Sequence, residues 1–347
     1  MKGLSVYLFF LFFCLHTAFA QRVIVRGRVT DAKTGETLSD ANVLEMNSST
    51  GMATNAYGLY SITLHTGRCV LQCSMLGYTT WSDTLQLSDN TVDIALQPND
   101  YLLKGVEVLG ARKHSGQFML DAQKIQALPV VGGEPDLIKT LQFLPGVQSG
   151  NEGANNISVR GSNQWGNLVL LDEAVVYNPT HVLSFFSVFN NDAIQKVDLY
   201  KSYFPLKYGG RSSSVIDVRM REGNSKERKR SASLGLIASK VLLEGPLKKG
   251  SYLVSGRFGY PGVTLGLLGG DLASKPQMWF YDVNAKVNTA LNDRNRLFFS
   301  LYSGGDHTVF NKLIKGYGMD WGNATATVRW NHILNDRTNI NTSAVFS

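Results

Sequence analysis

The side chains that usually carry out chemistry stand apart from one another in this chain. Six histidines occur, including His65, but none stands in an H-x-x-E or H-E-x-x-H pattern, the spacings with which helical residues bind zinc. The sequence also contains no glycine-rich phosphate-binding loop and no G-x-S-x-G nucleophile elbow. We therefore expect no metal site, no cofactor and no enzymatic activity.

Cys69 and Cys73 stand four residues apart in a segment that has the character of a β-strand. In an extended strand this separation corresponds to about 13 Å, whereas a disulfide needs Cα atoms within about 7 Å. We therefore expect two free thiols, buried on one face of a strand, even in a compartment that permits disulfides.

The first twenty residues have the pattern of a secretory signal peptide. Lys2 gives a positive start, residues 4–15 form an apolar stretch, and Ala18-Phe19-Ala20 is a small-residue cleavage site. The apolar stretch is shorter than the ~20 residues that a transmembrane helix needs. A lipoprotein site at Cys14 is disfavoured, because bulky phenylalanines precede this cysteine. We expect cleavage after Ala20 and export of a chain that begins near Gln21.

The composition favours a folded, β-rich protein. The chain is 44% hydrophobic and 18% charged, with 34 glycines and 9 prolines, which argues against disorder. Beyond the signal peptide no apolar run reaches the length of a transmembrane helix, so residence in a membrane would require a β-barrel. The net charge of +7 is spread along the chain, and the basic cluster at residues 226–230 is typical of a solvated turn. We expect no nucleic-acid partner.

Residues 22–98 show short, regularly spaced alternations that predict a small antiparallel β-sandwich. The expected strands cover residues 23–29, 41–46, 58–64, 69–75, 80–87 and 91–96. This region resembles the carboxypeptidase-regulatory-like domain through Gly27-Arg28-Val29-Thr30-Asp31, Asn55-Ala56-Tyr57-Gly58-Leu59-Tyr60 and Leu76-Gly77-Tyr78. Because clustered His and Glu ligands are missing, we expect a structural or docking module and not a peptidase.

Five short motifs follow one another between residues 155 and 219. Their types and order resemble the plug domain of the TonB-dependent outer-membrane receptors. The motifs are Val159-Arg160-Gly161, Leu171-Asp172, Tyr177-Asn178-Pro179, Asp192-Ala193-Ile194 with Val197, and Tyr208-Gly209-Gly210-Arg211. The resemblance implies an α+β plug domain over residues 129–220, lodged inside a membrane barrel.

Within the expected plug, Pro135 precedes a helix that carries Leu137 to Leu144. Strands at residues 168–171 and 175–176 are joined by a turn at Asp172-Glu173. The family favours Asp-Gly at this turn, so Glu173 predicts a different turn geometry. The resemblance also implies that Arg160 pairs with carboxylates of the barrel; an exposed arginine at the end of a strand is the alternative.

Residues 99–128 form a connector that contains a short apolar segment at residues 103–110. The resemblance implies that such a segment is the TonB box, so that Val106, Glu107, Val108 and Leu109 would add as a strand to the sheet of TonB. An ordinary strand of the plug would show the same pattern.

From residue 231 to residue 347 the pattern changes to long strands of period two. Trp279, Tyr281 and Val283 lie on one face of such a strand, and Asp282 and Lys286 lie on the other. Barrel strands that face lipid need this alternation. Short turns near residues 247–249, 292–294 and 335–337 alternate with long connections at 259–277 and 304–320, which is typical of outer-membrane barrels.

We expect six strands in this region. Closed outer-membrane barrels have at least about 8 strands, and plugged transporters have about 22. The chain is therefore expected to be the N-terminal part of a longer protein. The predicted fold is mainly β, with a small N-terminal β-sandwich, an α+β plug, and the first strands of an incomplete antiparallel transmembrane β-barrel.

The resemblance implies an outer-membrane receptor that takes up a nutrient, such as an oligosaccharide or a siderophore, with energy supplied through TonB. Its N-terminal domain would lie in the periplasm. Its partners would be TonB, outer-membrane lipid and, in receptors for polymeric nutrients, a surface lipoprotein. A passive or adhesive barrel, a non-functional receptor fragment and a secreted peptidase are the alternatives. The sequence does not identify the substrate.

Overall fold

A computed structural model describes residues 22–48, 50–65, 67–86, 91–99, 117–121, 135–149, 156–269, 277–310, 317–335 and 338–347. The expected signal peptide and the expected TonB box at residues 106–109 lie outside the described residues. The described residues are mainly β-strand, as predicted, and form two compact units that divide near residue 106. No helix in these ranges has the length and apolar character that a membrane crossing requires.

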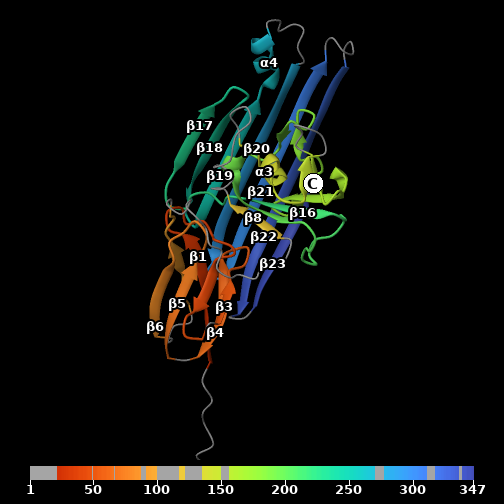
Figure 1. Cartoon of the computed structure of the whole chain (residues 1–347). Helices are drawn as coiled ribbons and strands as arrows, with labels where there is room; N and C mark the ends of the chain where they lie inside the picture. The colour runs from red at the N-terminus through yellow and green to blue at the C-terminus, as the bar shows by residue number, and fades with distance from the viewer. Residues whose placement is uncertain are drawn as a thin grey trace, which may run out of the picture. The chain divides into compact units, whose positions relative to one another are not determined.

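The first unit is a sandwich of two small sheets with strand orders β4-β1-β7 and β3-β2-β5-β6 (Figure 1). The strands are β1 (Arg22–Asp31), β2 (Asn42–Glu45), β3 (Thr50–Ala53), β4 (Leu59–His65), β5 (Arg68–Ser74), β6 (Trp81–Gln86) and β7 (Ile94–Leu96). The six expected strands are present, and β3 is additional. The expectation of a purely antiparallel sandwich is wrong at one place. The chain passes from the second sheet to the first between β6 and β7, and β7 then pairs parallel to β1.

Alternation along the strands directs one face of each sheet into a shared core. Val25 and Val29 of β1 are buried in the same cluster as Leu71 and Cys73 of β5. Cys69 and Cys73 are free and buried on one face of β5, as predicted. Burial raises the pKa of the Cys73 thiol to about 12, so this cysteine is not a reactive thiolate.

The second unit begins with a central domain built on a mixed sheet of strand order β12-β11-β16-β15-β8, in which β11 and β16 are parallel. Helix α3 (Leu137–Gln142) begins at Asp136, whose carboxylate accepts a hydrogen bond from the backbone N–H of Lys139. The expected helix and both expected strands are present, but the helix ends at Gln142, before Leu144, and the second strand covers residues 174–175. The strands of the domain are β8 (Gln117–Asp121), β9 (Val147–Ser149), β10 (Ile157–Val159), β11 (Asn167–Leu171), β12 (Ala174–Val175), β13 (Thr180–His181), β14 (Phe186–Ser187), β15 (Ile194–Tyr200) and β16 (Ser214–Met220).

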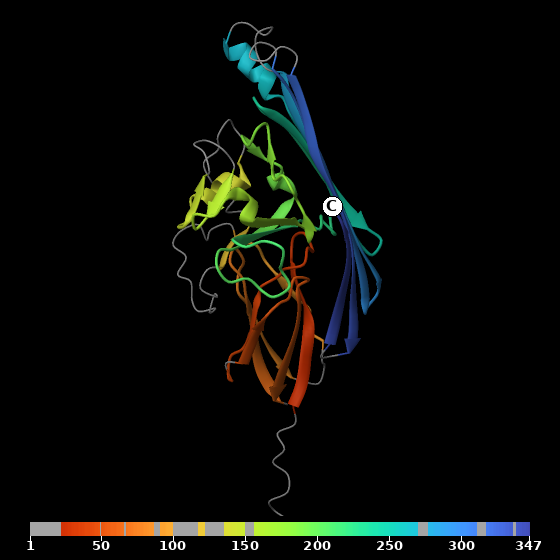
Figure 2. The ribbon, with the colours of Figure 1, turned by 90° about the vertical axis from the view of Figure 1, so that its right-hand side faces the viewer.

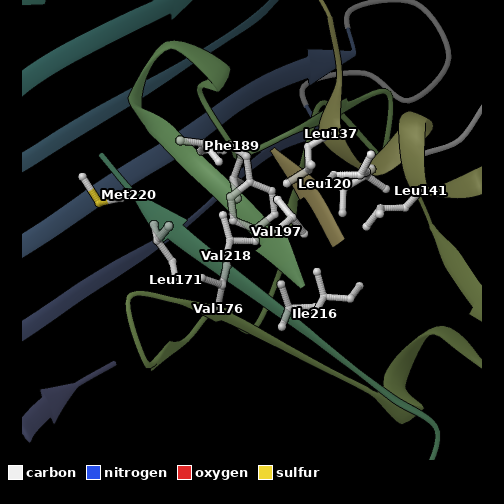
Figure 3. Packing of buried hydrophobic residues seen from close by; sticks show 14 of the residues in the cluster. Leu120, Leu137, Leu141, Leu171, Val176, Phe189, Val197, Ile216, Val218 and Met220 are labelled. Carbon is white, nitrogen blue, oxygen red and sulfur yellow. The ribbon is translucent and has the colours of Figure 1, made fainter. Parts of the chain in front are cut away.

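Apolar side chains of α3 and of the mixed sheet form the core of the central domain. Leu137 and Leu141 of the helix belong to the same buried cluster as Val197 of β15 and Val218 of β16 (Figure 3). This core holds β11 and β16 side by side, and therefore fixes the positions of the turns that follow them.

A seven-stranded sheet follows in chain order, with α4 (Pro261–Gly269) between its third and fourth strands. The expected count of six strands is one too low, because a short strand at residues 229–234 also pairs with its neighbour. The strands are β17 (Lys229–Leu234), β18 (Ala238–Leu247), β19 (Gly250–Gly259), β20 (Gln277–Asn292), β21 (Asn295–Phe310), β22 (Tyr317–Asn335) and β23 (Thr338–Phe346).

The two faces of this sheet differ as the period-two pattern predicted. Along β20, Trp279, Tyr281 and Val283 are exposed, whereas Asp282 and Lys286 are buried. Figure 2 shows the curved sheet nearly edge-on with the central domain beside it. The polar face is buried because the central domain covers it.

Gly27 lies where β1 passes closest to Val92. A Cβ atom at this position would overlap the backbone carbonyl of Val92, whose N–H donates to the carbonyl oxygen of Arg26. We expect Gly27→Ala to lower the free energy of unfolding of the isolated 22–99 unit by about 1–3 kcal/mol in a urea titration. Thr63→Ala, on the exposed face of β4, is the control and should change it by less than about 0.5 kcal/mol. Equal effects of the two substitutions would contradict the close approach at Gly27.

Candidate functional site: the interface between the central domain and the curved sheet

Asp172, a residue of the predicted plug motifs, joins the central domain to the sheet. Its carboxylate accepts hydrogen bonds from Lys286 Nζ at 2.8 Å, from Ser300 Oγ at 2.6 Å and from the backbone N–H of Met220 at 3.1 Å. The Thr327 hydroxyl donates to the Asp172 carbonyl oxygen at 2.9 Å. One residue of the central domain therefore contacts β20, β21 and β22 of the sheet.

The charge of Asp172 is stabilised within this buried site. Burial alone would raise the pKa of Asp172, but the ammonium group of Lys286 and then the guanidinium of Arg329 hold the pKa below its usual value. The interaction is therefore complete above the ordinary carboxyl pKa of about 3.9. It is lost only as the pH falls through the lowered pKa.

The turn at Asp172-Glu173 corrects an expectation from the sequence. Both residues have positive φ, 47° and 77°, as in the two-residue hairpin turns that favour Asp-Gly. The expectation that Glu173 imposes a different geometry is therefore wrong. The Glu173 carboxylate lies 3.0 Å from the guanidinium of Arg329 on β22. This ion pair offsets part of the cost of the left-handed backbone, which glycine would adopt without strain.

A second contact centres on His181, in the hairpin of β13 and β14. His181 Nε2 lies 2.7 Å from Asp282 Oδ1, and His181 Nδ1 lies 2.6 Å from Asp306 Oδ2. The backbone N–H of Val182 donates to the other oxygen of Asp306 at 2.7 Å. On the far side of Asp282, Arg257 Nε donates at 2.7 Å. We call His181, Asp282, Asp306 and Arg257 the His181 cluster.

The surroundings of His181 favour its charged form. The side chain is 1% exposed and its ring stacks on Phe280 with 4.5 Å between centroids. Burial alone would lower the pKa of His181, but the charge of Asp282 and the hydrogen bonds to both carboxylates raise the pKa above its ordinary value. A neutral imidazole has one N–H donor, whereas an imidazolium has two and can satisfy a carboxylate at each ring nitrogen.

The remaining contacts of the interface are mostly polar. Asn178 N–H donates to Asn323 Oδ1 at 3.2 Å, and Asn323 Nδ2 donates to the Asn178 carbonyl at 2.8 Å. Asn190 Nδ2 donates to Ser255 Oγ at 2.7 Å. In the described part of the sheet, the residues that join the apolar core of the central domain are Leu242, Leu253 and Tyr302. Ion pairs and amide hydrogen bonds therefore hold the interface together with these apolar contacts and with Phe280, on which Phe186 and His181 stack.

Other predicted site residues lie away from this interface. Arg160 is exposed at the end of β10 with φ 54°, and within the described ranges its guanidinium makes no ion pair. Gly161 follows it with φ 77°. Tyr177 is 63% exposed, Pro179 is half-buried, and Gly209, Gly210 and Arg211 lie in an exposed loop. Pairing of Arg160 with barrel carboxylates stays a prediction.

Sequence reasoning did not select the members of the His181 cluster. It placed Asp282 and Lys286 on the polar face of β20, but it attached no function to them. Charged residues on the inward-facing side of a strand are the signal that could have identified them, because buried charges require partners. Within the described residues, no group of three or more His, Cys, Asp or Glu side chains is arranged to hold a metal ion.

The domain order is decided by comparison with known families. Residues 25–108 match the CarboxypepD_reg-like domain, and residues 120–216 match the TonB-dependent Receptor Plug Domain. The chain carries the plug domain of a TonB-dependent receptor. Both resemblances inferred from the motifs are confirmed, and this family is not one of enzymes. The central domain is called the plug below, and the sheet of β17–β23 is called the barrel wall.

Solved structures of outer-membrane receptors are similar to this chain, and one of them reaches a TM-score of 0.50. The siderophore receptor PirA of Pseudomonas aeruginosa is 13% identical, with a TM-score of 0.50 over 67% of this chain and 40% of PirA. The ferric enterobactin receptor PfeA of the same organism, in a mutant form, has a TM-score of 0.47 and 13% identity over 64% of this chain and 39% of its own. The ferric-catecholate import receptor Fiu of E. coli has a TM-score of 0.47 and 17% identity over 65% and 37%. The chain thus spans about two fifths of the length of these receptors. No curated protein matches it.

The pairing of Asp172 with Lys286 can be tested by a double-mutant cycle. Asp172→Asn leaves a buried ammonium without its counter-ion, so we expect it to lower the free energy of unfolding of the full-length protein by about 3–5 kcal/mol. Lys286→Met in the same background removes the stranded charge and should restore much of the loss. Denaturant titration in detergent micelles measures both. Additive effects of the two substitutions would show that these residues do not interact.

Proposed function

We propose that the full-length protein is an outer-membrane receptor that imports a nutrient with energy delivered by TonB. The match of residues 120–216 to the plug family is the observation that carries this proposal. The plug–wall interface supports it, because a polar interface can separate without exposing a large apolar surface to water. Water can replace the partners of Asp172 and His181 when the plug moves.

The outer face of the barrel wall supports residence in a membrane. Phe258 and Trp279 are exposed near one end of the strands, with ring centroids 6.0 Å apart, and Trp330 is exposed near the other end. Trp279 pairs with His307 and Trp330 pairs with Leu297, so ten residues of β21 separate the two levels. Tilted strands of this length cover about 25 Å, the height of the apolar band of an outer-membrane barrel.

The N-terminal part of the chain has a place in the same proposal. Cleavage after Ala20 would release the chain into the periplasm, where the first unit would remain. Residues 106–109 would then be available to TonB as an added strand. The solved relatives are named as receptors for siderophores and, in one case, as a copper transporter. We propose a nutrient of the size of an oligosaccharide or a siderophore complex. A surface lipoprotein would be a further partner if the nutrient is polymeric.

A passive or adhesive barrel is the alternative function. It requires no plug, and it gives no role to buried ion pairs that join a plug to its wall. The plug match therefore favours energised import over this alternative.

The TonB segment can be tested by its main-chain hydrogen bonds. Val108→Pro removes a backbone N–H, so we expect the full-length receptor to lose at least about tenfold in affinity for the purified periplasmic domain of TonB. Val108→Thr keeps both the N–H and the strand propensity and is the matched control. Unchanged binding after deletion of residues 106–109 would reject this segment as the TonB contact.

Lipid contact can be tested with the fluorescence of the two outer tryptophans. Bromine on lipid acyl chains quenches only the indoles next to it. In vesicles of brominated lipid, we therefore expect Trp279→Phe and Trp330→Phe each to lower the fraction of tryptophan emission that is quenched. Trp165→Phe, in the plug, should remove fluorescence that lipid does not quench. Loss of quenched signal only in the Trp165 variant would contradict the orientation of the wall.

A further inference from the structure

We infer that the β13–β14 hairpin of the plug is a proton-dependent latch, held to the barrel wall by a doubly protonated His181 between Asp282 and Asp306. The latch itself needs only the docked plug, and its role in plug movement rests on the proposed function.

The charges around His181 balance only when it is protonated. Asp282 on β20 and Asp306 on β21 contribute two negative charges, and Arg257 on β19 contributes one positive charge. The Tyr302 hydroxyl donates to Asp282 at 2.9 Å and adds no charge. From the plug, Asp136 accepts a hydrogen bond from the Ser187 N–H at 2.7 Å, and Lys139 lies over the Phe186 ring. The charges of Asp136 and Lys139 offset each other. A protonated His181 together with Arg257 then balances the charges of the two wall carboxylates.

The cluster holds a hairpin that would otherwise relax. Val182, Leu183 and Ser184 have φ of 49°, 53° and 79°, a left-handed run without glycine. Its backbone is fixed by the Val182 N–H bond to Asp306, and the Ser187 carbonyl accepts from Arg257 at 2.6 Å. Two carboxylates and a guanidinium of the wall therefore hold a strained turn of the plug. Loss of the proton from His181 removes one of its two ring donors and leaves two buried carboxylates with one guanidinium, which weakens the hold.

The latch lies toward the end of the wall at which α4 lies between β19 and β20. At this end the expectation of a long connection at residues 304–320 is wrong, because β21 and β22 extend over residues 304–310 and 317–320. Asp282 pairs with Gly304 near the start of β20, and β20 follows the connection that contains α4. The Asp172 contact lies deeper, where Lys286 pairs with Ser300. The β13–β14 hairpin can therefore separate from Asp282 and Asp306 while Asp172 stays bound to Lys286 and Ser300.

The sign of the pH effect follows from the raised pKa of His181 in the docked state. The stabilisation is fully present below the ordinary histidine pKa of about 6.5, and it is lost as the pH rises through the raised value. Between these two values, undocking of the hairpin releases a proton. Acidification therefore opposes opening, and alkaline conditions favour it.

Hydrogen exchange of the full-length protein in detergent, without nutrient or TonB, tests the latch. After correction for the intrinsic pH dependence of amide exchange, we expect protection of the peptide that spans residues 180–187 to fall at least tenfold between about pH 6 and pH 10. Among the described residues no histidine contacts Asp172, so the peptide that contains it should keep its protection over the same range.

Two variants distinguish the effect of the His181 proton from a general loss of folding of the plug. Asp306→Asn removes one negative charge and offers an amide N–H to a neutral His181, so its protection should stay high and flat with pH. His181→Gln cannot bind the proton, so the protection of residues 180–187 in this variant should be low at every pH. Wild-type protection that does not change with pH, or an Asp306→Asn profile that falls as the wild type does, overturns the latch. If His181→Gln fails to assemble, the wild type and Asp306→Asn still decide, and a failure here leaves the TonB test untouched.

Discussion

The structure depends on the pairing of buried charges across a polar interface. A carboxylate that leaves water costs several kcal/mol unless donors surround it, and Asp172, Asp282 and Asp306 all lie in such positions. Asp172 and Asp282 are each satisfied by groups from several strands, and Asp306 is satisfied by the adjacent residues His181 and Val182 of the plug. Because a shifted plug would strand these charges, the pairs fix its position on the wall more strictly than apolar contacts would. The same pairs can be rehydrated, which distinguishes a removable plug from a permanent core.

Period-two alternation made the barrel wall predictable. Apolar and aromatic residues of β20 were assigned to one face and charged residues to the other, and the structure confirms this assignment. Pro135 and the apolar residues after it likewise located the helix, and the apolar residues around the turn at Asp172 located the two strands. These features are local, since hydrophobic period and turn residues determine them. The extra strand β3 and the parallel pairing of β7 with β1 were missed because both strands are short and their pairing depends on tertiary structure.

The partners of the polar residues could not be predicted from the sequence. His181 meets Asp282 and Asp306 only because the β13–β14 hairpin adopts positive φ at Val182, Leu183 and Ser184, against the preference of a β-branched residue. Glu173 similarly adopts a glycine-like φ next to Arg329. In both places tertiary ion pairs override local propensity, and a single sequence contains no pattern for such a choice. The role of Arg160 and the TonB segment remain predictions.

The most direct test of the docked plug is a disulfide between Asn178→Cys and Asn323→Cys in the full-length protein in its native membrane. These residues exchange two hydrogen bonds in the structure. A protease site placed at residues 225–226, between plug and wall, lets a gel report the cross-link. The account predicts that the two halves stay joined after cleavage until a reductant is added. The matched pair Asn178→Cys with Ala324→Cys, which points to the other face, should separate at once. Separation of the halves in the Asn178–Asn323 pair without reductant would contradict the docking of the plug on this wall.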